Sequence, residues 1–273
     1  MRRRMTFSGA IRSEFTRLVR SPLVPAHLVC ALAGGFACGL YFAVAPWDAS
    51  AGADAYVQFL GAMMPLMAGV VCGLAVDEER RAGGLANLAA VPSRRIALAA
   101  QCTALWLMGL AALALAVGVF AALLAAAGRL ALDGGTLALS VAGLSFGSAP
   151  LYALMIALSL RFGRNAAIGT GAAGLLLAFF SVGGLAHGLM TGEFTAVGSG
   201  LLGLEPFAWP ARLGSLAVEA AIAEAQGSAA IFLQVADAAA TTGILCAAAT
   251  LAALTALLAW FGRFEEGKSH AQF

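Results

Sequence analysis

The sequence predicts an all-α membrane protein with six transmembrane helices. Hydrophobic residues make up 61% of the 273-residue chain and charged residues only 11%, which is less than half the roughly 25% typical of soluble domains. The charges are also segregated, because six uncharged intervals are longer than 20 residues: 21–47, 55–76, 96–128, 134–160, 165–192 and 238–262. A water-soluble globular fold is therefore excluded.

Each uncharged interval is long enough for one membrane-spanning helix. Crossing a hydrocarbon core of about 30 Å takes about 20 apolar residues, and only a helix or a closed barrel satisfies its backbone internally. The alternation typical of a barrel strand is absent from runs such as residues 110–127. We place the spans at residues 25–45, 56–76, 96–127, 137–160, 166–190 and 238–261. The third, at about 1.5 Å per residue, is long enough to predict a tilt or a cytoplasmic extension.

The basic residues predict the orientation in the membrane. Fourteen of the sixteen Lys and Arg residues fall in the termini and loops of one side, and only Arg129 and Arg212 fall on the other. Because Lys and Arg mark cytoplasmic loops, both termini are predicted to be cytoplasmic. Eight of the fourteen acidic residues lie on the outer side, so the net charge is +8 inside and −6 outside. No Asp, Glu, Lys or Arg lies within the predicted spans, which disfavours a proton- or ion-coupled carrier.

The N-terminal segment predicts an amphipathic helix at the membrane interface. Apolar residues recur every three or four positions at Phe7, Ile11, Phe15 and Leu18, with arginines on the other faces. The alternative is a disordered basic tail. The arginines at residues 2–4 are not followed by a short apolar core and a cleavage site, so we expect no signal peptide.

The inner segment between the second and third spans, residues 77–95, carries the most informative pattern. It opens with paired acids and bases, passes through two glycines into a short apolar stretch, and ends at Pro92 before a basic pair. We predict a docking helix of about two turns with Leu85, Leu88 and Val91 exposed; the alternative is a solvated loop whose arginines only set topology. The candidate residues are Glu78, Glu79, Arg80, Arg81, Gly83, Gly84, Asn87, Leu88, Pro92 and Arg95.

This pattern resembles the coupling loop of ABC-2 type ABC transporter permease subunits, and it is most similar to that of lantibiotic protection (immunity) permeases. The matching positions are Glu79, Gly83, Asn87, Leu88, Pro92 and Arg95. The chain departs from the pattern at Ala86, where Gln is usual, and at Gln101, where a Lys often stands. The resemblance implies a single transmembrane domain over residues 1–273, whose residue 77–95 segment docks on a cytoplasmic ATPase.

The resemblance also implies a function and partners. The chain would be a multi-pass subunit of the bacterial cell membrane that exports a lantibiotic or similar cationic antimicrobial peptide for immunity, together with a second permease copy or paralogue. It would not itself be an enzyme or bind a cofactor or nucleic acid, since ATP and Mg would bind the partner ATPase. The alternatives are a membrane scaffold or assembly subunit, an uncoupled pore or secondary carrier, and an ABC-2 exporter of another amphipathic or lipid-like cargo.

The outer segment, residues 191–237, is too polar to span the membrane. Its polar residues Arg212, Ser215, Glu219 and Gln226 fall on one stripe of a helix, which predicts a surface or re-entrant helix before the last span. Pro206 and Pro210 flank Trp209, which predicts a helix start and an anchor at the membrane interface. The candidate residues here are Trp209, Arg212 and Glu219.

Two further sequence patterns are not interpreted as ligand-binding sites. A phosphate-loop string ends at Gly267, Lys268 and Ser269, but an apolar span precedes it instead of a strand and no helix of useful length can follow, so we reject it. Glycine pairs four residues apart predict close helix packing; they are Gly35 and Gly39, Gly69 and Gly73, and Gly143 and Gly147.

Overall fold

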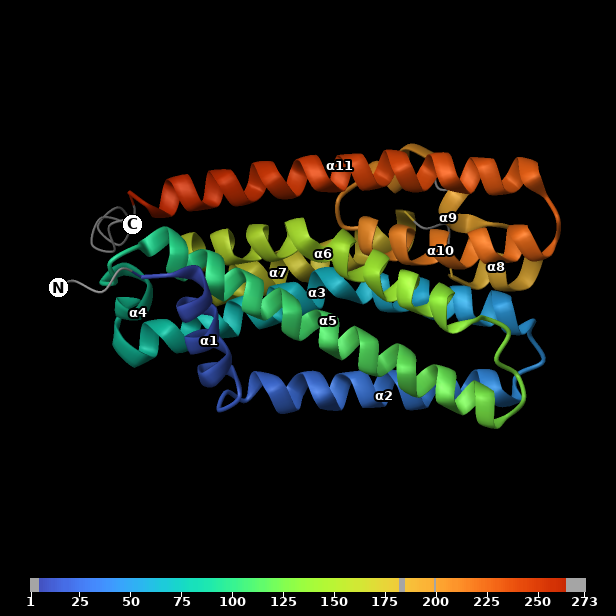
Figure 1. The fold of residues 1–273 in the computed structure, drawn as a ribbon, viewed down its shortest axis with the longest axis horizontal. Coiled ribbons are helices and arrows are strands. Elements are labelled where there is room, and N and C mark those ends of the chain that lie inside the picture. The colour runs from blue at the N-terminus through green and yellow to red at the C-terminus, as the bar shows by residue number, and fades with distance from the viewer. Residues whose placement is uncertain (1–4, 182–184, 199, 264–273) are drawn as a thin grey trace.

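The protein is an elongated bundle of helices in the computed structural model, which describes residues 5–181, 185–198 and 200–263 (Figure 1). Every described element is helical. The elements are α1 Phe7–Leu18, α2 Leu23–Val44, α3 Ala49–Gly83, α4 Ala86–Ala89, α5 Arg94–Ala126, α6 Gly134–Phe162, α7 Arg164–Ser181, α8 Leu185–Thr191, α9 Thr195–Gly198, the 3-10 helix η1 Gly200–Leu204, α10 Trp209–Ala225 and α11 Ala229–Phe261.

Five of the described helices are long and apolar enough to cross a membrane, namely α2, α3, α5, α6 and α11. Helix α7 is 18 residues long, and its first two residues, Arg164 and Asn165, lower its hydropathy. Residues 182–184, which separate α7 from α8, lie outside the described residues. Helix α7 packs along α3 within the bundle, and a sixth span at residues 166–190 stays a prediction.

The helices extend beyond the predicted spans. Helix α3 has 35 residues, and α5 and α11 have 33 residues each. At about 1.5 Å per residue each reaches about 50 Å, which exceeds the hydrocarbon core by about 20 Å. The great length predicted for the third span is therefore shared by two other helices, and the first residues of the 77–95 segment continue α3 instead of forming a loop.

Local sequence explains where several helices begin. Thr6, Asp48, Ser93 and Asp133 each precede a helix and accept a hydrogen bond from a backbone N–H of its first turn. Asp48, for example, accepts from the N–H groups of Ser50 and Ala51 at 2.9 Å. These caps satisfy donors that the helices themselves leave unpaired.

The three glycine pairs lie at close contacts between helices, as predicted. A Cβ atom added to Gly35 would lie 2.7 Å from the carbonyl oxygen of Ala116, which brings α2 against α5. The equivalent distance is 2.5 Å from Gly69 to Ala167 of α7, and 2.4 Å from Gly143 of α6 to Leu213 of α10. Small residues let helix backbones meet where side chains would otherwise hold them apart.

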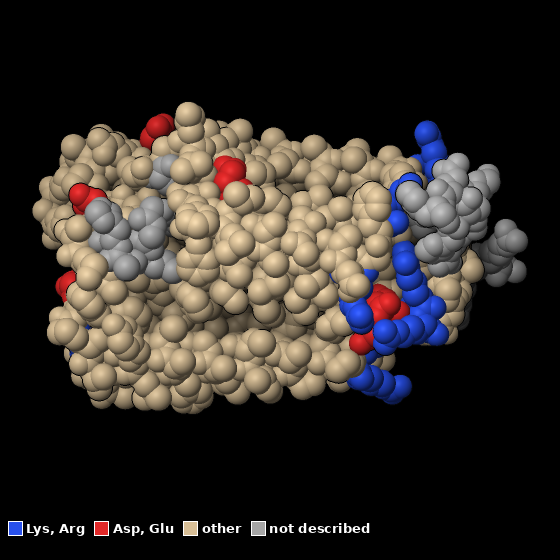
Figure 2. Space-filling model, turned by 180° about the vertical axis from the view of Figure 1, so that it is seen from behind, with Lys and Arg blue, Asp and Glu red and all other residues tan. Residues whose placement is uncertain are grey.

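Charged side chains gather at the two ends of the bundle, and Lys and Arg side chains collect at one of them (Figure 2). Helix α1 lies across this end, which also holds α4 and the C-terminal end of α11 (Figure 1); we call it the basic end. This segregation agrees with the charge pattern of the sequence, while the cytoplasmic location of the basic end stays a prediction. Arg2, Arg3, Arg4 and Lys268, together with Gly267 and Ser269 of the phosphate-loop string, lie outside the described residues.

The predicted N-terminal helix is present as α1. Phe7 and Phe15 are 46% and 39% exposed, whereas Leu18 is 3% exposed and belongs to the bundle core. The apolar face of α1 is thus partly packed against the bundle and partly exposed. Its position at a membrane interface stays a prediction.

Candidate functional site

The 77–95 segment forms a compact reversal of the chain at the basic end. Helix α3 ends at Gly83, and Gly84 adopts a left-handed conformation with φ of 59°. The Gly84 N–H donates to the carbonyl oxygen of Arg80 at 2.8 Å, which closes the helix end. Leu85 also has a positive φ, 61°, a conformation that costs a non-glycine residue about 1–2 kcal/mol. Packing of its side chain, which is fully buried, offsets this cost.

The expected exposure of the apolar residues in this segment is wrong. Leu85 and Leu88 are 0% and 1% exposed and belong to the bundle core, and Val91 packs against that core. They are buried because α4 has only four residues, so its apolar side must fold onto α3 and α5 to be stable. The exposed residues of the segment are Arg81, Ala82, Gly83, Gly84, Ala86, Asn87, Ala90, Pro92 and Arg95. A partner would therefore meet small and polar groups.

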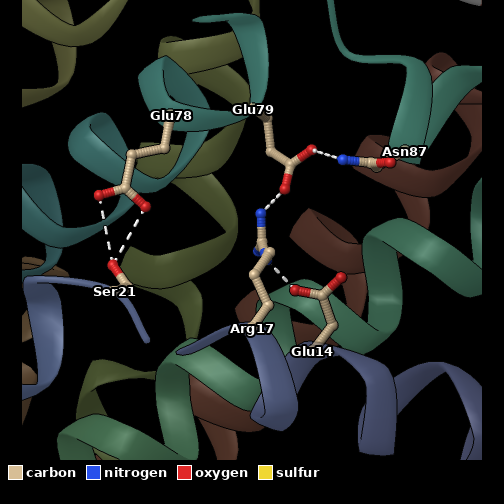
Figure 3. Close-up of polar contacts among 6 residues, drawn as sticks. All are labelled: Glu14, Arg17, Ser21, Glu78, Glu79 and Asn87. Carbon is tan, nitrogen blue, oxygen red and sulfur yellow. Dashed lines mark hydrogen bonds and ion pairs between the residues drawn. The ribbon is translucent and has the colours of Figure 1, made fainter. Parts of the chain in front are cut away.

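Glu79 joins three elements at the basic end (Figure 3). Its side chain is 2% exposed and forms an ion pair with Arg17 of α1. It also accepts a hydrogen bond from Nδ2 of Asn87, in α4, at 3.0 Å. Arg17 in turn pairs with Glu14 at 2.5 Å. We call Glu14, Arg17, Glu79 and Asn87 the clasp, since they connect α1, the end of α3 and α4.

The surroundings of the clasp are partly polar and partly hollow. Glu78 accepts from Oγ of Ser21 at 3.1 and 3.2 Å, so a second carboxylate near the end of α3 binds the turn between α1 and α2 (Figure 3). Burial raises the pKa of the Glu14 carboxyl, and the Arg17 guanidinium offsets part of that rise. A cavity of about 280 Å³ lies beside the clasp, with Ser13 and Val91 in its wall.

The arginines of the segment contact the ends of other helices. Arg80 donates to the carbonyl oxygens of Ser159 and Leu160 at 3.3 and 2.6 Å, near the end of α6. Asp77 pairs with Arg81 at 2.8 Å and with Arg164 of α7 at 3.1 Å. Arg95 lies beside Gly262 at the end of α11, since a Cβ on Gly262 would be 2.9 Å from its Nε. The segment is thus a junction of helix ends, and its arginines are more than topology signals.

The outer-segment helix is present as α10, but its polar stripe faces inward. Arg212, Ser215 and Glu219 are 7%, 0% and 0% exposed, because α10 packs between α3, α6 and α11. Trp209 begins the helix, with Pro210 next to it. The prediction that Trp209 is an interface anchor is wrong, because it is 4% exposed and its Nε1 donates to the carbonyl oxygen of Leu204 at 3.0 Å.

The buried stripe of α10 organises the chain before it. Glu219 accepts from the backbone N–H groups of Ala196 and Val197 at 2.8 and 3.1 Å. Arg212 donates to the carbonyl oxygens of Ala196 and Gly203, both at 3.0 Å. These two candidate residues therefore hold α9 and η1 in place.

Sequence reasoning missed two residues that join this stripe. Asp54 and Gln58 are 8% and 2% exposed and lie one turn apart on α3, where Asp54 falls two residues before the predicted span. Asp54 accepts from Oγ of Ser215 and from Nε2 of Gln58, the latter at 2.8 Å. The spacing of four residues in an otherwise apolar run was the available signal, since it places both side chains on one helix face.

The bundle of long apolar helices with charged ends defines a multi-pass membrane protein. The chain belongs to the family described as ABC-2 family transporter protein, which matches residues 10–183. This match begins within α1, includes the clasp and the 77–95 segment, and ends before α8. Comparison with curated proteins gave no match. The predicted ABC-2 class is confirmed, and the lantibiotic immunity subfamily stays a prediction.

Proposed function

We propose that this chain is the permease subunit of an ATP-driven exporter, with its basic end in the cytoplasm and the exposed surface of residues 81–95 docked on a separate ATPase subunit. The family assignment supports a transporter. The observation that carries the docking proposal is the clasp, in which the buried side chain of Glu79, near the end of α3, contacts both α1 and α4. ATP and Mg would bind the ATPase, and a second permease copy or paralogue would complete the transport path.

The clasp suggests how movement of the ATPase would reach the membrane. Leu85 and Leu88 fix α4 to the core, so a push on α4 acts on the bundle instead of only bending a loop. Glu79 passes that push to α1 and to α3, whose 35 residues reach about 52 Å towards the opposite end. The contacts of Arg80 with the end of α6 and of Asp77 with α7 recruit two further helices. The spans would then rock between inward-open and outward-open states.

For the cargo we propose a lantibiotic or a similar cationic antimicrobial peptide. The outer side carries a net charge of −6 in the predicted topology, which would raise the local concentration of cationic peptides. A different amphipathic or lipid-like cargo is the alternative within the same class. A membrane scaffold without its own transport path is the rival from another class.

A matched pair of substitutions tests the docking surface. Ala90 is exposed beside α4, and Ala127 is exposed at the opposite end, after α5. We expect the tagged wild-type chain to co-purify with an ATPase subunit in mild detergent, Ala90→Arg to lose most of it, and Ala127→Arg to retain it. Absence of an ATPase from the wild-type preparation, or its full retention by Ala90→Arg, would contradict the proposal.

A transport assay distinguishes an exporter from a scaffold. In inside-out vesicles that contain the complex, ATP should drive uptake of a labelled lantibiotic, and Ala90→Arg should abolish this uptake. A complex that assembles and hydrolyses ATP but moves neither a lantibiotic nor a labelled lipid would favour the scaffold.

A further inference from the structure

A polar cavity of about 500 Å³ lies at the end of the bundle opposite the clasp. The start of α3, the end of α10 and the chain from residue 188 to 195 form its wall. Three of its described lining residues are acidic, namely Asp48, Asp54 and Glu193, and no described lining residue is Lys or Arg. The described part of the wall is therefore acidic.

Asp54 is the deepest acidic residue of this wall, and no base within the described part of the chain neutralises it. Its two hydrogen-bond partners, Ser215 and Gln58, are both neutral, and it takes part in none of the ion pairs among the described residues. Arg212 is directed instead to the carbonyl oxygens of Ala196 and Gly203. A buried carboxylate without a counter-charge is costly, because desolvation disfavours the charged form.

Gln58 supplies a second and independent observation. Its side chain is 2% exposed and lines the cavity. Its Nε2 lies 2.8 Å from Asp54, 2.7 Å from Oγ1 of Thr195 and 3.1 Å from Oγ of Ser215, while its Oε1 has no partner. An amide group has two N–H donors, so three acceptors exceed what it can satisfy. Whichever way the amide is turned, one of its polar atoms lacks a partner.

We propose that this cavity binds the primary ammonium group of an aliphatic amine, such as a lysine side chain or the amino terminus of a peptide. An ammonium group has three donors and a positive charge, which match the Asp54 carboxylate, the Gln58 carbonyl oxygen and a hydroxyl oxygen of the cluster. Ala51, Ala55 and Ile222 supply apolar wall for the alkyl chain.

The size of the cavity and its donor set favour an organic cation over a metal ion. A cavity of about 500 Å³ falls in the range of small-molecule sites, about 300–1,000 Å³. Among the described residues no group of three or more His, Cys, Asp or Glu side chains could hold a metal ion. The binding inference concerns the chain itself and does not rest on the ATPase.

Direct binding of a simple amine tests the site. The full chain is placed in phosphatidylcholine nanodiscs without nucleotide or ATPase and titrated with hexylammonium, and empty nanodiscs give the bilayer background. Hexanol and hexanoate, which have the same chain length, serve as neutral and anionic probes. We expect saturable binding of hexylammonium and none of the other two probes. Equal binding of hexanoate, or a hexylammonium signal no larger than that of empty nanodiscs, would overturn the proposal.

Substitutions that each replace one carboxylate by a neutral amide locate the site. Asp54→Asn should weaken hexylammonium binding at least tenfold, whereas Asp237→Asn, which removes an exposed carboxylate of α11 outside the cavity, should change it less than twofold. Glu193→Gln and Asp48→Asn alter exposed rim residues and should each weaken binding two- to threefold; Asn also preserves the helix cap at residue 48. These rim variants keep the test valid if Asp54→Asn does not fold. Wild-type affinity in both rim variants or in folded Asp54→Asn would refute the site.

The two proposals fail separately. If the chain binds amines but no ATPase co-purifies with it, the amine site is supported and the exporter proposal is contradicted. If an ATPase co-purifies but no amine binds, the exporter proposal is supported and the amine site is contradicted.

Discussion

Replacing Glu79 by Gln tests whether the clasp transmits movement from α4 to α1. Gln has nearly the shape of Glu and retains an oxygen that can accept from Asn87, so the change removes the charge that faces Arg17 without opening a cavity. Arg17 keeps its contact with Glu14 at 2.5 Å, and its side chain is 31% exposed. The Arg17 guanidinium therefore keeps Glu14 as a partner and stays partly accessible to solvent.

The size of the effect follows from the burial of the two partners. Breaking a buried ion pair by removing one partner costs about 3–5 kcal/mol, and an exposed pair is worth about 0–1 kcal/mol. Because Glu79 is 2% exposed and Arg17 is 31% exposed, we expect an intermediate loss of about 1–2 kcal/mol. A loss of about 1.4 kcal/mol shifts the balance between attached and detached α1 tenfold.

The assay compares transport with ATP hydrolysis in proteoliposomes that contain the whole complex. Glu79→Gln should retain the ATPase, since the exposed surface of the 77–95 segment is unchanged, but should lower export per ATP about five- to tenfold. Glu78→Gln is the matched control, because Glu78 is partly exposed and, among the described residues, its side chain hydrogen-bonds only the Ser21 hydroxyl; its effect should be less than twofold. Arg17→Met combined with Glu79→Gln should be no worse than the more severe single change, since both substitutions remove the same Arg17–Glu79 ion pair. Equal effects of the two Gln variants, or additive losses in the double variant, would refute this reasoning.

Three further changes test the packing and the charges of the structure. Gly35→Leu should sharply reduce the yield of folded protein in size-exclusion chromatography, because a Cβ there lies 2.7 Å from the Ala116 carbonyl oxygen, whereas Gly34→Leu should be tolerated because nothing lies within 4 Å; equal yields would contradict the packing of α2 on α5. Arg212→Met should lower the free energy of unfolding by about 2–4 kcal/mol, since it removes two buried hydrogen bonds from a charged donor, and an unchanged thermal midpoint would count against it. Because burial raises the pKa of Glu14 above its ordinary value of 4.5, its ionisation opposes folding: Glu14→Gln should raise the thermal midpoint at pH 7 and have little effect at pH 4, and the opposite pH dependence would show that the pair with Arg17 dominates.

The sequence predicted most of the helices, because the signals for helix position are local. Each charge-free interval corresponds to a described helix or, for residues 165–192, to α7 and α8. The ends were less accurate, since a helix continues past its apolar stretch wherever capping residues allow. Helix α3, for instance, begins after the Asp48 cap and ends at Gly83, before the Gly84 cap, so it includes residues that composition alone assigned to loops.

The sequence predicted several residues of the candidate site but not how their side chains contact one another. Glu79 and Asn87 were identified from the motif, and they do contact each other. Their link to Arg17 was not predictable from spacing, because α1 is separated from them by the whole of α2 and most of α3. The exposure of Leu85 and Leu88 was predicted wrongly, since the face that a four-residue helix presents depends on what it packs against.

The sequence by itself determined that this protein lies in a membrane, where its helices run, that its basic residues gather at one end, and that it carries the ABC-2 pattern. These properties follow from composition and from residues close together along the chain. Only the tertiary structure decided that Glu79 clasps α1, and that Asp54 meets Ser215 across 161 residues of sequence. Such contacts depend on which helix faces pack together, and the polarity of a single segment cannot specify its neighbour when most faces of the bundle are equally apolar.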